Sequence, residues 1–236
     1  MTFDLSVRNR QPELMDQPNI SAASFTDTLK GLHRVNIVTR STRLMWPDLV
    51  AATRRQPNRP VRVLDVASGG GDVPIALWKR ATRAGLKVEL EGCDVSPIAV
   101  RYAGEAAAKA GVRMRFFQHQ VPRNSLPDGY DMIMSTLFLH HLDEEDAVTF
   151  LRQAAAKCRD RVVIQDLIRS PLSYWFARFG TTFLLLNEIC RLDGRTSVES
   201  AFTRAEAKAL ARRAGLEGSE VVARLPFRYL IRWVRH

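Results

Sequence analysis

A glycine-rich stretch near residue 70 carries the residues best suited to holding a nucleotide-like ligand. The apolar, β-branched run Val61–Val66 has the length and composition of a buried parallel strand. Gly69 and Gly71 follow it, and then comes an apolar helix with Pro74 in its first turn. Glycine lets the backbone approach a ligand closely, and a helix N-terminus presents free N–H groups. The stretch therefore predicts a strand–turn–helix unit that binds a nucleotide or a related cofactor.

The spacing of these glycines excludes two common nucleotide motifs. A dinucleotide fingerprint needs a third glycine where Pro74 stands, and a Walker loop needs a Gly-Lys-Ser/Thr sequence that the stretch lacks. The remaining pattern is an acid, Asp65, followed by Ala67, Gly69 and Gly71 at alternate positions. It resembles motif I of the class I S-adenosylmethionine (SAM) dependent methyltransferases, with Ala67 in the first glycine position, where alanine fits unless the loop needs a positive φ. A glycine turn in another kind of α/β protein is the alternative.

Two polar residues stand at the ends of the next two predicted strands. Asp94 lies about 20 residues after the glycines, where a Rossmann-like fold places the acid that accepts hydrogen bonds from both ribose hydroxyls. Its alternative role is to begin a turn or cap the next helix, a role that Ser96 and Pro97 fill better. In the methyltransferases that motif I resembles, the following strand usually ends in an aspartate that contacts the adenine amino group. Gln120 stands there instead, and its carbonyl oxygen can accept the same bond without charge.

Two adjacent histidines supply candidate acid–base groups. His140 and His141 follow the predicted strand Tyr130–Thr136 in a Leu-His-His-Leu sequence. The carboxyl end of such a strand borders the ligand crevice of an open α/β sheet, and imidazole titrates near neutral pH. Either histidine could therefore act as a general base. The structural alternative is that a histidine near the start of a helix bonds a backbone carbonyl.

The remaining pattern alternates between strands and helices. Besides the two strands above, strands are expected at 87–94, 113–118, 161–167, 221–222 and 227–234, the last two as a hairpin. Helices are expected between them, and this alternation is typical of an α/β fold with a parallel sheet.

The chain divides into an N-terminal part, residues 1–59, and a domain over residues 60–236. The N-terminal part is polar up to residue 20 and then has the pattern of two amphipathic helices, the second interrupted at Trp46-Pro47. Simple packing on the sheet and a lid over the site are equally compatible with this pattern.

A helical insertion is expected at residues 171–200, after the fifth strand. Its apolar run Leu172–Cys190 contains Arg178 and Gly180, which argues against a membrane span. A helix or helix pair that covers the pocket, with peripheral contact to lipid allowed, fits better. The polar stretch Arg191–Ser197 that follows is expected to be a loop facing substrate.

Composition and charge limit the choices further. With 236 residues, 46% hydrophobic and 25% charged, the chain has the composition of an ordinary soluble protein. The three cysteines, Cys93, Cys158 and Cys190, are far apart, which favours no disulfide, no zinc site and a reducing cytoplasm. The first residues lack the apolar region of a signal peptide. The net charge of +10 comes from scattered arginines, so it allows a nucleic-acid partner without indicating one.

Motif I, Asp94, the strand order and the paired histidines together resemble a class I SAM-dependent methyltransferase over about residues 60–236. The glycine stretch is also similar to that of the ubiquinone/menaquinone-biosynthesis C-methyltransferases and their relatives that act on small lipophilic molecules. The resemblance implies a Rossmann-like, seven-stranded, mostly parallel sheet flanked by helices, with a final antiparallel strand and SAM across the carboxyl ends of the strands. It places the methionine part of SAM at Gly69 and Gly71, the ribose at Asp94 and the adenine at Gln120, with Asp65 orienting the loop that contains Ala67.

The predicted function is methyl transfer from SAM to an oxygen or carbon atom of a small aromatic or lipophilic acceptor, quinone- or polyketide-like in kind. An RNA methyltransferase is the first alternative and is favoured only by charge. Against it, Ser135–Phe138 stands in place of the Asn/Asp-Pro-Pro-Tyr/Phe motif that serves transfer to an adenine amino group. The sequence also contains no Pro-Cys pair, so no cysteine is placed to attack C6 of a pyrimidine. A SAM-binding protein without catalysis is the second alternative. No metal ligand is assigned, and the sequence does not indicate an oligomeric state.

Overall fold

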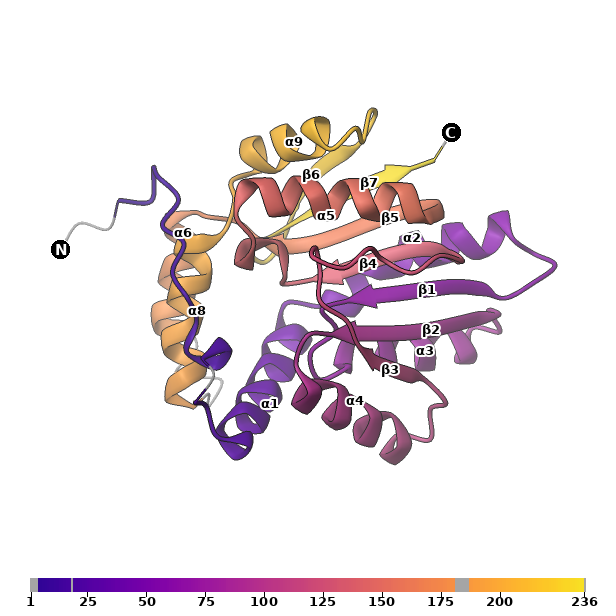
Figure 1. The fold of residues 1–236 in the computed structure, drawn as a ribbon, viewed down its shortest axis with the longest axis horizontal. Coiled ribbons are helices and arrows are strands. Elements are labelled where there is room, and N and C mark those ends of the chain that lie inside the picture. The colour runs from indigo at the N-terminus through magenta and orange to yellow at the C-terminus, as the bar shows by residue number, and fades with distance from the viewer. Residues whose placement is uncertain (1–3, 18, 181–186, 236) are drawn as a thin grey trace.

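The computed structural model describes residues 4–17, 19–180 and 187–235, in which a seven-stranded sheet lies between layers of helices (Figure 1). The strands are β1 (Val61–Val66), β2 (Val88–Asp94), β3 (Arg115–Gln118), β4 (Tyr130–Thr136), β5 (Cys158–Leu167), β6 (Glu220–Arg224) and β7 (Arg228–Val234). The helices are α1 (Ala22–Val38), α2 (Ser41–Arg55), α3 (Asp72–Arg83), α4 (Pro97–Lys109), α5 (Glu144–Lys157), α6 (Pro171–Trp175), α8 (Glu188–Ser200) and α9 (Arg204–Arg213). Short helical turns are η1 (Leu14–Asp16), η2 (Leu139–His141) and η3 (Phe176–Gly180).

The strand order is β3-β2-β1-β4-β5-β7-β6, and β7 runs antiparallel to both of its neighbours. Strand β1 pairs in parallel with β2 on one side and with β4 on the other. The order of the strands therefore reverses between β1 and β4, and open α/β sheets bind their ligands outside the carboxyl ends of the strands at such a point. The predicted Rossmann-like sheet with its final antiparallel strand is confirmed.

Alternating side chains give the sheet two apolar faces. Val61 and Val63 of β1 belong to the core shared with α2 and α3, where Leu77 is fully buried. Leu64 belongs to the opposite core, shared with α5 and α9, where Phe150 is fully buried. Because successive side chains of a strand point to opposite faces, one short apolar strand supplies both cores.

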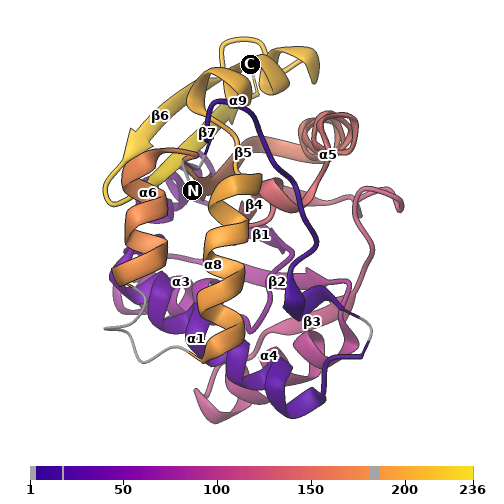
Figure 2. The same ribbon diagram turned by 90° about the vertical axis from the view of Figure 1, so that its left-hand side faces the viewer.

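A further group of segments closes the carboxyl edge of the sheet. Figure 2 shows α6 and α8 in front of the strand ends, with the N-terminal segment, residues 4–17, running along α8. Arg8 Nε donates to the carbonyl oxygen of Ser200 at 2.6 Å, and Leu14 N donates to Asp193 Oδ1 at 2.7 Å. Helix α1 packs against both α8 and α4. Any ligand at the switch point is therefore covered by segments from both ends of the chain.

Two sequence-based expectations are wrong. Helix α2 continues through Pro47 instead of being interrupted there. Met45 and Leu49 on either side are completely buried, and this packing outweighs the lost backbone donor. The stretch Arg191–Ser197 is helical, because Asn187 caps α8 by accepting from Cys190 N at 2.8 Å and helix formation continues from there. Residues 181–186 of the expected insertion lie outside the described residues. Within the described ranges, no helix is both long and apolar enough to cross a membrane.

Candidate active site

A cavity of about 450 Å³ opens at the carboxyl edge of the sheet. Its wall includes Gly69 and Asp94 on one side and His140 and His141 on another. The N-terminal segment adds Glu13, and α1 and α8 add further side chains. The structure thus brings Ala67, Gly69, Asp94 and Gln120 of the predicted cofactor site to one continuous space with both histidines. The other two predicted cofactor residues, Asp65 and Gly71, do not line this space.

The glycine loop between β1 and α3 has the backbone conformation that glycine supplies. Gly69 and Gly71 have φ angles of 52° and 73°. A Cβ atom on Gly71 would lie 2.8 Å from Phe116 Cζ and 3.0 Å from Ala103 Cβ, so no larger residue fits without displacement. Gly71 N donates to the carbonyl oxygen of Ser68 at 2.9 Å, which closes the turn. The loop therefore lets the backbone form part of the cavity wall.

Ala67 departs from the usual glycine and nevertheless adopts a left-handed conformation, with φ at 56°. A non-glycine residue in this region costs on the order of 1–2 kcal/mol. The condition under which alanine would strain the loop is therefore met, although Ala67 still lines the cavity.

Asp94 lies at the end of β2 and holds the glycine loop to the next turn. Its Oδ2 accepts from Gly69 N and its Oδ1 accepts from Ser96 N, both at 2.9 Å. Burial raises the pKa of the Asp94 carboxyl, while the two amide donors act in the opposite direction. Ser96 in turn caps α4 by accepting from Ala99 N. Asp94 faces the cavity, so contact with a ribose remains a prediction added to this structural role.

Asp65 lies beneath the loop and is almost completely buried. Its Oδ1 has no hydrogen-bond partner among the described residues. Burial, together with Asp72 and Asp94, raises the pKa of Asp65 well above its usual value. Its predicted role in orienting the loop is left as a prediction.

The loop after β3 offers two side chains where an adenine contact is expected. Gln120 lines the cavity, as does the preceding His119. His119 N donates to the carbonyl oxygen of Asp94 at 2.9 Å, while its buried Nε2 has no partner in the described part of the chain. Sequence reasoning considered Gln120 alone, although a histidine next to it offered the same kind of signal.

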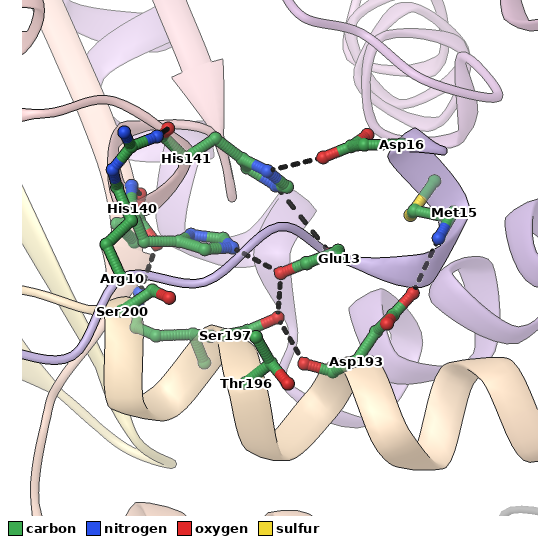
Figure 3. A network of polar contacts seen from close by, with 12 residues as sticks. Arg10, Glu13, Met15, Asp16, His140, His141, Asp193, Thr196, Ser197 and Ser200 are labelled. Carbon is green, nitrogen blue, oxygen red and sulfur yellow. Dashed lines mark hydrogen bonds and ion pairs between the residues drawn. The ribbon is translucent and has the colours of Figure 1, made fainter. Parts of the chain in front are cut away.

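His140 is held on both sides by carboxylates, and Figure 3 shows the one on the side of Glu13. Its Nδ1 lies 2.7 Å from Asp166 Oδ1 and its Nε2 lies 3.4 Å from Glu13 Oε1. Its backbone N–H also donates to Asp166 Oδ2 at 3.0 Å. Burial alone would lower the pKa of His140, but Asp166 and Glu13 raise it to about 10. This arrangement favours the cationic ring with both nitrogens protonated, and a general-base role for His140 stays a prediction.

His141 is the more accessible of the two histidines, with 26% of its side chain exposed. Its Nδ1 lies 3.1 Å from Asp16 Oδ2, and its Nε2 lies 3.9 Å from Glu13 Oε2. The two imidazole rings are 4.3 Å apart, and both Nε2 atoms face the same Glu13 carboxylate.

Glu13 completes this group and was missed by sequence reasoning. It lies in a segment whose polar composition indicated irregular structure, yet it is 5% exposed. Ser197 contacts its carboxylate. Burial raises the pKa of Glu13, but His140, His141 and Ser197 together outweigh it, so the pKa is lowered. Asp193 accepts from Leu14 N and Met15 N and so fixes the backbone next to Glu13. Nothing in the local sequence marks a contact with residues so far along the chain.

A buried arginine forms another part of the wall. Arg228 at the start of β7 has no measurable exposure, and its Nη2 donates to Thr39 Oγ1 at 3.2 Å. Its Nε and Nη1 have no hydrogen-bond partner among the described residues. Burial lowers the pKa of Arg228 to about 10, against the influence of Asp166.

Comparison with known proteins agrees with this geometry. Residues 63–161 match the family model described as a methyltransferase domain. The ubiquinone biosynthesis O-methyltransferase of Bordetella bronchiseptica is 30% identical over 194 residues, covering 80% of this chain and 72% of the relative. The protein of that description from Bordetella avium is 29% identical over 214 residues, covering 87% and 80%.

Solved structures share the fold at lower identity. The SAM-dependent methyltransferase SibL superposes with a TM-score of 0.66 at 20% identity, covering 98% of this chain, which spans 64% of SibL. The magnesium protoporphyrin IX methyltransferase of Synechocystis PCC 6803, solved with bound SAH, gives a TM-score of 0.59 at 15% identity, covering 94% and 91%.

The chain belongs to the class I SAM-dependent methyltransferases. Its cofactor is S-adenosyl-L-methionine. The glycine loop, with backbone close to the ligand space, and the charged side chains that project from the strand ends suit a cationic, ribose-bearing ligand of this kind.

Proposed function

We propose that the chain transfers the methyl group of SAM to an oxygen or carbon atom of a small aromatic or lipophilic acceptor, with a hydroxyl oxygen favoured. The observation that carries this proposal is the continuous cavity that the glycine loop and the carboxylate-bound histidines share. Its volume of about 450 Å³ is typical of sites for small molecules. The recurring description of the curated relatives, ubiquinone biosynthesis O-methyltransferase, supports an oxygen acceptor.

The apolar lining supports a lipophilic acceptor. Leu29 of α1, Phe176 of η3 and Phe227 before β7 all line the cavity. On the outside of the same wall, Leu172 and Trp175 of α6 are 65% and 63% exposed. Apolar side chains thus lie both on the cavity surface and on the outer surface of this wall. Such a wall suits an acceptor, such as a quinone- or polyketide-like molecule, that approaches along an apolar surface.

Bound SAM supplies a sulfonium methyl group that is already activated for in-line displacement. The protein must hold the acceptor atom about 3 Å from this methyl group and exclude water. A hydroxyl acceptor also loses a proton. His140 already shares its protons with Asp166 and Glu13. We therefore assign removal of the acceptor's proton to the neighbouring pair, Glu13 and His141.

Of the N-terminal part, residues 4–17 and α1 act, in this proposal, as a lid that contributes to the site, whereas α2 packs on the sheet. Arg8 donates to the carbonyl oxygens of His140 and Leu142, at 2.9 and 2.7 Å, so the N-terminal segment is tied to η2. The same segment carries Glu13 into the cavity wall. Simple packing on the sheet would require neither contact.

The RNA alternative has little support in the arrangement of the arginines. Arg59 forms two hydrogen bonds with the buried Asp131, and Arg169 forms two with Glu206. Arginines in such contacts serve the fold and are not free to bind phosphate.

The test is incubation of the purified protein with SAM carrying a radiolabelled methyl group and a host lysate, followed by separation of organic, RNA and protein fractions. Label in the organic fraction is expected. Label in RNA would overturn the small-molecule assignment. SAM binding without label in any fraction would favour the non-catalytic SAM-binding alternative.

A further inference from the structure

A cluster of three side chains beside the cofactor motif has the composition and geometry of a metal site. The ligand atoms that Glu13, His140 and His141 offer all lie within 4.8 Å of one another. All three side chains line the cavity, and two of them are buried. We propose that Glu13, His140 and His141 bind one divalent transition-metal ion. Their end of the cavity, where the proposed acceptor would bind, is called the acceptor end. The sequence alone assigned no metal ligand here, because Glu13 is distant in the chain and the cysteine pattern gave no zinc motif.

The distances within the cluster are close to those of a coordination sphere. His140 Nε2 lies 3.4 Å from Glu13 Oε1, and His141 Nε2 lies 3.9 Å from Glu13 Oε2. Ligand atoms about 2.1 Å from a metal ion are separated by about 3.0–3.4 Å in octahedral or tetrahedral geometry. The ligand atoms of the whole cluster spread over up to 4.8 Å, so the three side chains must draw together by as much as about 1.4–1.8 Å to share one ion.

The opposite edges of both imidazole rings are already bound by carboxylates. His140 Nδ1 lies 2.7 Å from Asp166 Oδ1, and His141 Nδ1 lies 3.1 Å from Asp16 Oδ2. Metal-bound histidines almost always donate their second ring N–H to a carboxylate, a carbonyl or a water, which fixes the tautomer. Here both Nδ1–H groups have such an acceptor, so both Nε2 atoms can offer a lone pair toward Glu13.

The donor set indicates the kind of metal. Two imidazoles and one carboxylate are the protein ligands of catalytic zinc sites and of the non-haem iron(II) facial triad. Both leave coordination positions open for water or substrate. Calcium and magnesium prefer oxygen donors and are disfavoured by the two nitrogens.

The carboxylates around the cluster also supply negative charge for such an ion. Glu13, Asp166 and Asp16 are all within hydrogen-bond or ion-pair distance of the two histidine rings. With the rings neutral, these three negative charges exceed the two positive charges of a divalent cation by one. Without a metal, the same groups form ion pairs with a protonated His140, and the two arrangements are distinguished by metal binding itself.

The role of the ion, as distinct from its binding, rests on the proposed function. An ion in this position would polarise an acceptor hydroxyl and make its proton easier to lose to water. This role favours acceptors whose reactive hydroxyl has a second oxygen beside it, because two oxygens can occupy two open positions. With the ion bound, Glu13 and His141 would serve as its ligands in place of the proton-removing role proposed for the metal-free site.

The test is titration of the chelator-treated full chain with Zn²⁺ and with Co²⁺, followed by calorimetry and by the visible d–d absorption of Co²⁺. The wild type is expected to bind one equivalent of metal with micromolar or tighter affinity. His141→Ala and Glu13→Gln should each weaken binding by about 100-fold, and Asp16→Ala by about 10-fold, since it removes a partner of a ligand. His33→Ala is the matched control: it removes a half-exposed histidine outside the cluster, and binding should not change.

Failure of this inference is separable from failure of the proposed function. The metal site would be overturned if the wild-type protein bound no equivalent of metal. It would also be overturned if the Glu13→Gln and His141→Ala variants, shown by thermal melts to be folded, bound metal as tightly as wild type. Methyl transfer at full rate after chelation would remove the role of the ion and leave the proposed function intact. Stoichiometric metal with no methyl transfer to any fraction would instead count against the proposed function and leave the site standing.

Discussion

The two ends of the cavity are built in different ways. At the cofactor end, the glycine loop and Asp94 come from consecutive strand–helix units, and the contacts that shape them are backbone turns and amide–carboxylate bonds. At the acceptor end, the charged residues come from three distant parts of the chain. Glu13 and Asp166 form ion pairs with His140, and Arg228 interacts electrostatically with Asp166.

This difference coincides with the bounds of the region that matches the methyltransferase family model. The region that matches the methyltransferase domain, residues 63–161, contains the cofactor end and the two histidines, whereas Glu13, Asp166 and Arg228 all lie outside it. A common cofactor can be held by a common local motif. The part of the site proposed to distinguish acceptors is assembled from segments outside the residues that match the family model.

The largest expected effect is on the acceptor end. Asp166→Ala should lower the free energy of unfolding by about 3–5 kcal/mol, because it leaves the protonated His140 and the buried Arg228 without their shared counter-charge. Urea denaturation followed by circular dichroism measures this. As a control, Asp128→Ala removes the exposed pair with Lys157 and should cost less than about 1 kcal/mol. Equal losses of unfolding free energy in the two variants would show that Asp166 does not stabilise His140 and Arg228 as a buried counter-charge.

The next effect concerns the cofactor end. Asp94→Ala should weaken SAM binding at least about tenfold, because a carboxylate that anchors Gly69 N, and is predicted to accept from the ribose, is lost. Isothermal titration calorimetry measures the affinity. Asp94→Asn keeps an acceptor for the loop and should fall between wild type and Asp94→Ala. SAM affinity unchanged in both variants would remove Asp94 from the cofactor site.

The smallest effect tests strain in the glycine loop. Ala67→Gly relieves a positive φ but increases the entropy of the unfolded chain, so the protein should be between unchanged and about 1 kcal/mol more stable. Ala108→Gly in α4, an exposed helical position, should instead lose about 1 kcal/mol. Thermal melts of the two variants compare them directly. A loss at Ala67 as large as that at Ala108 would show that alanine is not strained there.

The same division explains what could be predicted from the sequence. The strands and the loop at Gly69 follow from local patterns, and they were predictable because period-two burial and glycine turns act over a few residues. The sheet with its final antiparallel strand was instead implied by the resemblance to the methyltransferases. Helix α2 was predicted to break at Pro47 because sequence reasoning could not see the complete burial of Met45 and Leu49.

The candidate site was predictable to a similar degree. His140 and His141 could be placed at the crevice because they follow β4 directly. Their partners could not, since contacts of Glu13 and Asp166 with His140 depend on how distant segments fold together. His140, predicted as a general base from its type and position, lies between two carboxylates that favour its protonated form, and its role as a base stays a prediction.

The central claim is that the cofactor end and the acceptor end are separate parts of one catalytic cavity. Glu13→Gln tests it most directly, with SAM affinity and single-turnover methyl transfer to the acceptor recovered from lysate measured on one preparation. The account predicts SAM affinity within about twofold of wild type and methyl transfer lower by about 100-fold. Glu105→Gln on the exposed face of α4 serves as the control and should change neither. Unchanged methyl transfer in Glu13→Gln, or a loss of SAM affinity as large as the loss of transfer, would contradict the account.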